Sequence, residues 1–148
     1  MTGVQTCALP ILLANTFSMY LKTHNFHWNV EGMLFSQLHE FFGDLYTELW
    51  NAVDPIAEHI RYLDSYAPGS LGRYMELSSV TDENAVPTSR DMIMKLLADN
   101  DIVRASLYDA FRAANAANEQ GLSNFIQDRI GAHDKHHWML RSYLKSVG

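Results

Sequence analysis

Two histidines and two carboxylates in the first half of the chain, His27, His39, Asp54 and Glu58, have the residue types and spacing of metal ligands. Imidazole and carboxylate groups bind iron, zinc and manganese in proteins, and the absence of cysteine ligands favours iron or manganese. Asp54 and Glu58 are four residues apart, so on a helix their side chains share one face and can approach a single ion. The four residues are therefore the predicted metal ligands.

Distance along the chain decides how these ligands can meet. His39 and Asp54 lie fifteen residues apart in one predicted helix, which is about 22 Å at roughly 1.5 Å per residue. Two ligands of one ion must lie within about 4–5 Å of each other, given bonds of roughly 2.0–2.2 Å. The sequence therefore predicts either no shared site or an intersubunit site, in which a two-fold axis brings His27 and His39 of one copy to Asp54 and Glu58 of another.

The ligands lie in two segments with helical periodicity. Residues 34–63 predict a long helix that bends at Pro55, because proline removes one amide donor without interrupting the apolar pattern. Gly32 suits a short turn between this helix and the preceding one, so the two helices must be antiparallel. The preceding helix, residues 12–29, is predicted to bury a stripe composed of Leu13, Phe17, Tyr20, Leu21, His24 and Trp28.

The second half of the chain completes a helical bundle. Residues 64–88 form a long turn-rich connection, with a short helix expected at 71–77. A third helix, capped near Thr88, is expected to reach about Ala117, and a fourth covers about 122–145. The sequence shows no convincing strand. It therefore predicts an all-α, four-helix bundle with ferritin-like connectivity, in which the long crossover joins helices two and three.

Length, composition and net charge argue against some classes of function. The chain has 148 residues, the size of one domain, and no apolar run approaches the roughly 20 residues that a membrane span needs. Its formal net charge of −6 does not favour DNA binding, since DNA-binding proteins gain affinity from Lys and Arg that neutralise phosphates. DNA is therefore not favoured as a partner, and no membrane partner is expected.

The first eleven residues, MTGVQTCALPI, resemble the translation of a common sequencing adapter. They carry no charge and no helical pattern that continues into the following residues, so we predict that residues 1–11 are not native and that the domain covers 12–148. Cys7, the only cysteine of the chain, lies in this segment. With no disulfide framework, the chain fits a reducing cytoplasm.

Four segments of the sequence, KTHNFHWNVEG, LHEFF, DPIAE and HDKHHWMLRSYL, resemble the Dps family of miniferritins, named for DNA protection during starvation. The resemblance implies a hollow dodecamer built from two-fold dimers. It also implies ferroxidase sites at the dimer interfaces, which oxidise Fe(II), preferably with hydrogen peroxide, and store the ferric product. The two histidines of the family fall on His27 and His39, and its acidic pair on Asp54 and Glu58.

One position departs from the family pattern. The family usually has an aspartate four residues after the second histidine, where this chain has Gly43. Asp44 is a poor substitute, because it points roughly 140° away around the helix. We therefore expect a weak second metal position, which Gly43→Asp should restore. An alternative function stays open: a shell or DNA-associated structural protein whose ferroxidase centre Gly43 and Pro55 have weakened.

Other histidines and Trp28 have competing interpretations. Trp28 is most simply a core residue, but its counterpart in the family lies beside the metal site. His133, His136 and His137 could bind a metal at His/Asp spacing, but they are expected to be structural or surface residues. The Glu-x-x-His motif of a di-iron site within one bundle is missing, and its nearest match is Asp134-Lys135-His136-His137.

Overall fold

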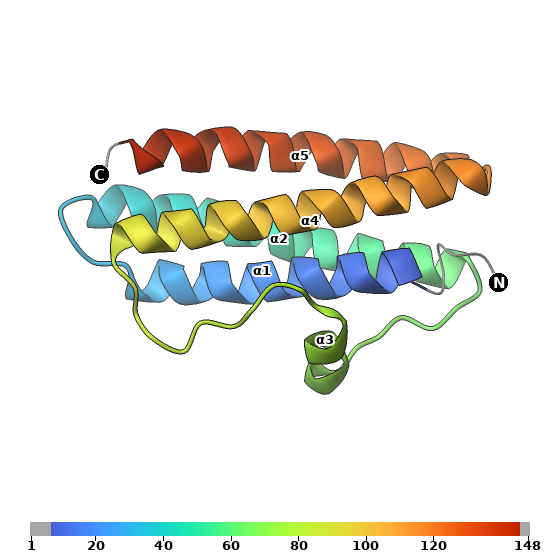
Figure 1. Ribbon diagram of the computed structural model, residues 1–148, viewed down its shortest axis with the longest axis horizontal. Coiled ribbons are helices and arrows are strands. Elements are labelled where there is room, and N and C mark those ends of the chain that lie inside the picture. The colour runs from blue at the N-terminus through green and yellow to red at the C-terminus, as the bar shows by residue number, and fades with distance from the viewer. Residues whose placement is uncertain (1–6, 146–148) are drawn as a thin grey trace.

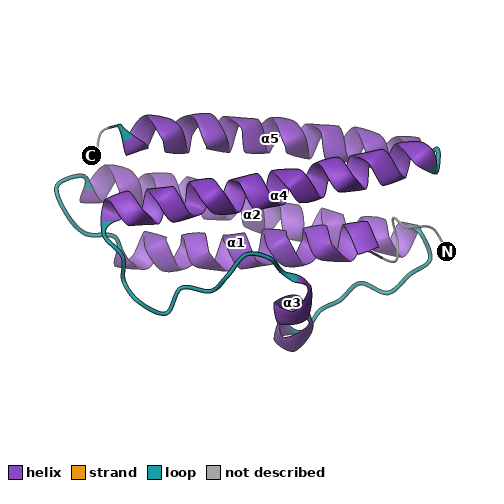
Figure 2. Cartoon of the chain, in the orientation of Figure 1, coloured by secondary structure: helices purple, strands orange, loops and turns teal. Residues whose placement is uncertain are grey.

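The computed structural model describes residues 7–145, which form a bundle of long helices (Figure 1). In chain order the helices are α1 (Leu9–Asn29), α2 (Phe35–Tyr62), α3 (Leu71–Leu77), α4 (Ser89–Ala116) and α5 (Gln120–Leu144). The four long helices lie side by side, and within residues 7–145 there are helices and loops without strands (Figure 2). The predicted all-α, four-helix bundle is confirmed, and each long helix starts and ends within about three residues of its expected position.

Local signals explain where the helices begin and turn. The Thr88 side chain accepts a hydrogen bond of 3.2 Å from the amide of Asp91, which satisfies one free donor at the start of α4. The Ser70 side chain caps α3 in the same way. Gly32, between α1 and α2, has a φ of 112°, a conformation that residues with a side chain rarely adopt. Asn118 takes a left-handed φ of 58° between α4 and α5.

The crossover from α2 to α4 runs along the outside of the bundle and carries α3 against α1 (Figure 1). Asn15, buried in α1, fixes the crossover in place. Its side-chain oxygen accepts a hydrogen bond of 2.7 Å from the amide of Ser79, and its side-chain nitrogen donates to Ser106 of α4 at 2.7 Å. The ring of Tyr74 in α3 lies 4.8 Å from that of Phe17. The long connection is therefore held in a defined position against α1.

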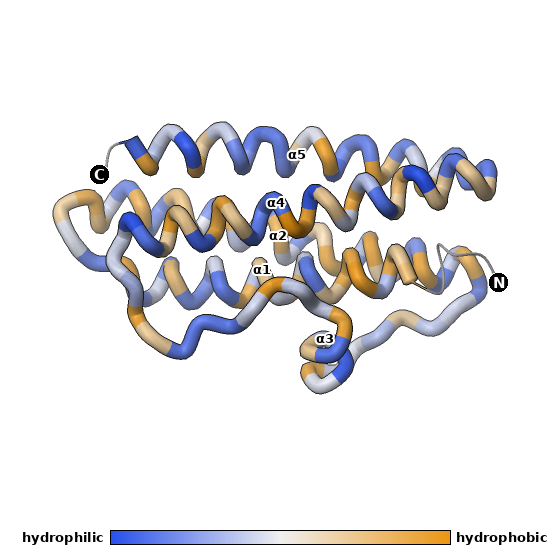
Figure 3. Tube along the Cα trace, in the orientation of Figure 1, coloured by the Kyte–Doolittle hydropathy of each residue, from blue (hydrophilic) through white to orange (hydrophobic). Residues whose placement is uncertain are grey.

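The buried face of α1 matches the predicted stripe at Leu13, which is fully buried, but differs from it at other positions. The helix buries residues such as Leu12, Met19 and Phe26, whereas Leu21 is 42% exposed and Trp28 is 61% exposed. Hydrophobic positions recur around the helices (Figure 3), and α1 has apolar residues on two faces. Packing against α2 and α4 selects one of them. The prediction that Trp28 is a core residue is wrong, because the second, aromatic face of α1 points outward.

The ends of the first two helices also bear on the predictions. α2 continues through Pro55, and Ile56 and Ile60 beyond it are fully buried, as the uninterrupted apolar pattern predicts. α1 begins at Leu9, which is fully buried, so its first turn lies inside residues 1–11. Residues 1–6 lie outside the described part of the chain, and the foreign origin of the segment stays a prediction. No helix among the described residues is long and apolar enough to cross a membrane.

Candidate metal centre

His27 and His39 are brought together by the α1–α2 hairpin. His27 lies in the last turn of α1 and His39 near the start of α2, so the short turn around Gly32 places them opposite each other. Their rings stack with centroids 3.9 Å apart and an angle of 17° between the ring planes. Both side chains are half-buried. The structure thus brings these two predicted ligands side by side within one chain, and their binding of a metal stays a prediction.

Two reciprocal hydrogen bonds orient the paired imidazoles. Nδ1 of His27 donates to the carbonyl oxygen of His39 at 2.6 Å, and Nδ1 of His39 donates to the carbonyl oxygen of His27 at 2.7 Å. Because a carbonyl oxygen only accepts, each ring carries a proton on Nδ1, which leaves Nε2 as the ring atom that can bind a metal. Metal-binding histidines are commonly oriented by a hydrogen bond of this kind from the other ring nitrogen. The pair therefore fits a metal ion.

Gly43 leaves room for this pair. A Cβ atom at position 43 would lie 3.2 Å from both Cε1 and Nδ1 of His27, closer than a side chain normally approaches a ring. Asp44 faces elsewhere, into a pocket that it lines with Glu48 and His136. The structure thus agrees with the sequence-based view that Asp44 does not replace the carboxylate missing at position 43.

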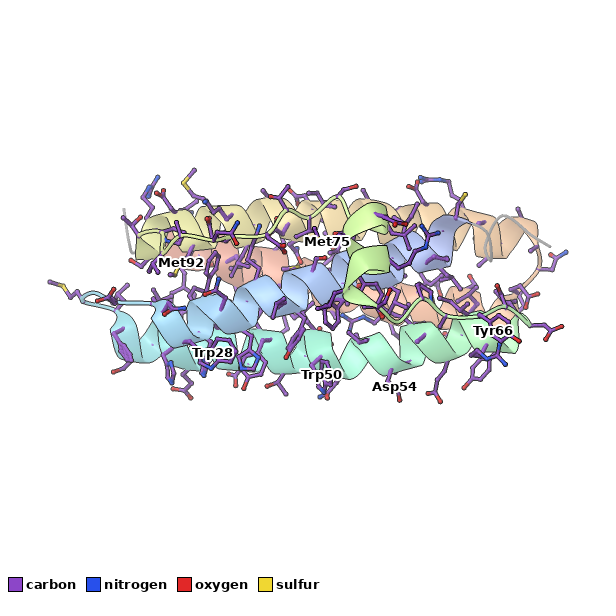
Figure 4. The ribbon with its side chains drawn as sticks, turned by 90° about the horizontal axis from the view of Figure 1, so that it is seen from below. Trp28, Trp50, Asp54, Tyr66, Met75 and Met92 are labelled. Carbon is purple, nitrogen blue, oxygen red and sulfur yellow. The ribbon has the colours of Figure 1, made fainter. Side chains whose placement is uncertain are left out.

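Asp54 and Glu58 lie farther along α2 and are exposed. Asp54 lines an open pocket with residues including Trp50 and Pro55, and Figure 4 shows Trp28, Trp50 and Asp54 spaced along one edge of the bundle. Since α2 is continuous from Phe35 to Tyr62, the separation of about 22 Å from His39 holds within one chain. One chain brings the two histidines together but leaves both carboxylates apart from them, and the intersubunit site stays a prediction.

An aromatic layer lies beside the histidine pair on the outer face of α1 and α2. His24 stacks on Tyr46, with ring centroids 3.8 Å apart, and its Nδ1 lies 3.0 Å from the hydroxyl oxygen of Tyr20. The Trp28 ring lies 4.0 Å from His24. Burial, followed by the nearby His27, lowers the pKa of His24. His24 therefore belongs to this outer layer and not to the buried stripe in which the sequence placed it.

A second cluster contains two histidines for which the sequence left metal binding as the less favoured interpretation, together with a carboxylate that sequence reasoning missed. In residues 7–145, one group of three potential ligands has its ligand atoms within 4.8 Å of one another: Glu48, His133 and His136. The two histidines, expected to be structural or surface residues, are 1% and 7% exposed. Their spacing of three residues on one helix face was a usable signal. Their approach to Glu48 could not be predicted, because it depends on how α5 packs against α2.

The chain belongs to the ferritin-like family, because the family description "Ferritin-like domain" matches residues 7–147. Proteins of similar sequence place the chain in one family within this class. DNA protection during starvation protein 2 of Bacillus anthracis is 31% identical, and the match covers 85% of this chain and 86% of that protein. The chain is therefore a member of the Dps family within the ferritin-like proteins.

Solved structures agree with this assignment. Dps of Staphylococcus aureus has a TM-score of 0.90 at 32% identity, covering 95% of this chain and 94% of that one. The Dps protein of Vibrio cholerae O1 has a TM-score of 0.91 at 28% identity, covering 95% of this chain and 88% of that one. That protein is described as a member of the ferritin-like diiron-carboxylate superfamily. Both matches support the same bundle and chain order.

Proposed function

We propose that the protein is an iron-oxidising and iron-storing miniferritin that protects against oxidative damage. Its sites are shared between two subunits, with His27 and His39 from one copy and Asp54 and Glu58 from the other. The observation that carries this function is the reciprocal hydrogen bonding of His27 and His39, which leaves both Nε2 lone pairs available to a metal ion. The Dps membership of the chain makes Fe(II) the expected substrate.

Each group has a separate role in this proposal. The neutral imidazoles of His27 and His39 hold Fe(II), and the carboxylates of Asp54 and Glu58 balance the positive charge that grows on oxidation. Two Fe(II) ions each give one electron to hydrogen peroxide, which takes up two protons and leaves as two water molecules. This two-electron reaction suppresses hydroxyl-radical formation, because peroxide is not left half-reduced.

The outer face of α1 and α2 supports assembly from identical copies. Trp28 and Trp50 are 61% and 51% exposed on this face, where isolated subunits would leave large aromatic rings in water. Asp54, one of the predicted ligands, lies along the same edge of the bundle as these two rings (Figure 4). A two-fold interface here would cover the aromatic layer and complete the metal site together. A dodecamer built from such dimers, located in the cytoplasm, is the proposed form.

Fe(II) oxidation driven by hydrogen peroxide tests the function. We expect His39→Ala and Glu58→Ala each to lower the rate at least about tenfold relative to the wild type, since each removes a ligand from one half of the site. Glu76→Ala, which removes an exposed carboxylate from α3, is the matched control and should keep the wild-type rate. Equal rates in all four proteins would contradict the enzymatic function.

A shell with a weakened ferroxidase centre is the second candidate. The observation that favours it is the missing carboxylate at Gly43, for which Asp44 does not substitute. In that case the wild type would oxidise Fe(II) no faster than His39→Ala, while still assembling. A DNA-associated role is not favoured by the net charge of −6.

A further inference from the structure

A second group of potential ligands lies inside the bundle, between α2 and α5. Glu48 of α2 and His133 and His136 of α5 each place one ligand atom within 4.8 Å of the others. None of them belongs to the histidine pair or to the carboxylate pair of the proposed ferroxidase site. A carboxylate and two imidazoles are the protein ligands of many zinc sites and of some non-haem iron sites. The chemistry of a single divalent cation is therefore present here within one chain.

His133 is held in the form that binds a metal. Its Nδ1 donates to the side-chain oxygen of Asn100 at 2.7 Å, while the Asn100 nitrogen donates to the carbonyl of His133 at 2.9 Å. Burial, followed by the charge of Arg129, lowers the pKa of His133 well below its ordinary value. Nε2 of His133 lies 3.0 Å from Nη2 of Arg129, which can only donate, so these hydrogen bonds leave the Nε2 lone pair directed into the cluster.

Glu48 supplies the negative charge. Burial acts to raise its pKa, but hydrogen bonds from His136 and Arg129 outweigh this effect and hold the pKa well below its ordinary value. Oε1 of Glu48 lies 2.7 Å from Nε2 of His136. For His136 to bind a cation through Nε2, the ring must carry its proton on Nδ1, which is the usual tautomeric change at such ligands.

Arg129 already places a positive charge among these ligands. Its Nη2 lies 3.0 Å from Oε1 of Glu48 and 3.0 Å from Nε2 of His133, and its Nη1 contacts Oε2 of Glu48. The cluster is thus arranged around a cation. A guanidinium cannot be deprotonated in a protein, so a metal ion can enter only by displacing Nη2 from its place between the two ligand atoms.

The cluster also has a path to solvent. A pocket of about 340 Å³ is lined by Glu48 and His136, together with Asp44, Lys135 and other residues of α2 and α5. Glu48 itself is 36% exposed at its side chain. An ion can therefore reach Glu48 and His136 from this pocket, and water from the pocket can complete its coordination.

We propose that Glu48, His133 and His136 form a second metal site, which takes one divalent cation of the Zn²⁺ or Fe²⁺ class in competition with the guanidinium of Arg129. The site lies within one subunit, so it does not depend on the interface that the proposed ferroxidase site requires. It is mononuclear, and its ligands differ from the Glu-x-x-His pairs of a di-iron bundle.

Titration with Co²⁺ tests the site, because Co²⁺ occupies zinc sites and reports its ligand geometry by visible absorption. The experiment uses the full chain carrying His39→Ala, which disables the shared site. We expect one Co²⁺ per chain, with the visible absorption band of a Co²⁺ ion that has a low coordination number. Arg129→Gln, which removes the competing charge, should tighten binding about tenfold or more, and Glu48→Gln should weaken it about tenfold or more. Glu40→Gln, an exposed change on the same helix, should leave binding unchanged.

Three results would overturn the site: no bound Co²⁺ in the His39→Ala protein, binding that Glu48→Gln leaves intact, or binding that Arg129→Gln does not tighten. Circular dichroism confirms that each variant is folded. His133→Asn is a fourth variant, and loss of the band in a folded protein would support the site. A protein that binds Co²⁺ at Glu48 but oxidises Fe(II) normally without His39 would support this site and contradict the proposed ferroxidase function.

Discussion

The paired imidazoles of His27 and His39 show how backbone geometry orients two predicted metal ligands. Each ring donates to the carbonyl of the other residue, at 2.6 and 2.7 Å, so the rotation and the tautomer of both rings are fixed by the hairpin. The sequence could identify these two residues as candidate metal ligands from their types and spacing. It could not predict the reciprocal hydrogen bonds, because they require the exact register of α1 against α2.

Gly43 offers a test at the scale of one residue. Gly43→Asp adds a carboxylate beside the histidine pair, but its Cβ also presses on the His27 ring at 3.2 Å. Gly43→Ala adds the same Cβ without the carboxylate and is the matched control. We expect the aspartate variant to oxidise Fe(II) faster than the alanine variant, measured as initial rates with peroxide, because only aspartate supplies a ligand for the second metal position.

Equal rates in the two Gly43 variants would show that a carboxylate at this position does not contribute to the site. A rate for Gly43→Ala well below that of the wild type would show that displacement of the His27 ring is itself costly. The comparison therefore separates the steric effect of the Cβ from the chemical effect of the carboxylate.

At the scale of elements, apolar periodicity predicts the helices but not always their buried faces. The continuous pattern of α2 identified both its extent and its core residues, such as Leu38, Phe42 and Leu49. α1 is different, because its aromatic residues form a second apolar face that periodicity cannot distinguish from the core. The approach of Glu48 to His133 and His136 was also beyond prediction, since these residues meet only when α5 packs beside α2.

A buried ion pair joins α1 to α4. Nζ of Lys22 lies 2.9 Å from Oδ2 of Asp99, with side chains only 6% and 7% exposed. Burial raises the pKa of Asp99 above its ordinary value, against the opposing effect of Lys22. Ionising Asp99 therefore costs stability as the pH rises from about 3.8 toward neutrality. The pair is expected to specify the packing of α1 more than to strengthen it.

Single and double substitutions test this ion pair. Lys22→Met alone leaves the Asp99 carboxylate buried without its partner, and we expect it to lower the free energy of unfolding by about 3–5 kcal/mol. Lys22→Met with Asp99→Leu should come within about 1 kcal/mol of the wild type, or exceed it. Urea unfolding at fixed protein concentration measures both. A double variant as unstable as the single one would contradict this interpretation.

At the scale of the whole molecule, the outer aromatic face is the feature that a single bundle does not explain. Trp50 is 51% exposed, and its ring centroid lies 5.0 Å from that of Tyr20 in the same layer. Several large aromatic rings exposed to water on one face are unusual for a stable monomer. This face and the separated ligand pairs both favour association with a second copy.

Measuring the size of the assembly tests whether the outer aromatic face is a subunit interface. Trp50→Glu places a charge in the proposed interface, and we expect it to convert the assembly into smaller species, measured by analytical ultracentrifugation. Tyr66→Glu, at a residue of the crossover that is 87% exposed, is the control and should assemble like the wild type. An unchanged size for Trp50→Glu would contradict an interface at this face.

Mixing of variants tests the shared site most directly. His39→Ala and Glu58→Ala chains are assembled together in equal amounts, and mass spectrometry confirms the mixture. In a mixed dimer with shared sites, one of the two sites receives its histidines and its carboxylates from intact halves. Half of the dimers are mixed, so about a quarter of all sites should be intact, and about a quarter of the wild-type rate of Fe(II) oxidation should return. A mixture no more active than either variant alone would contradict an intersubunit site.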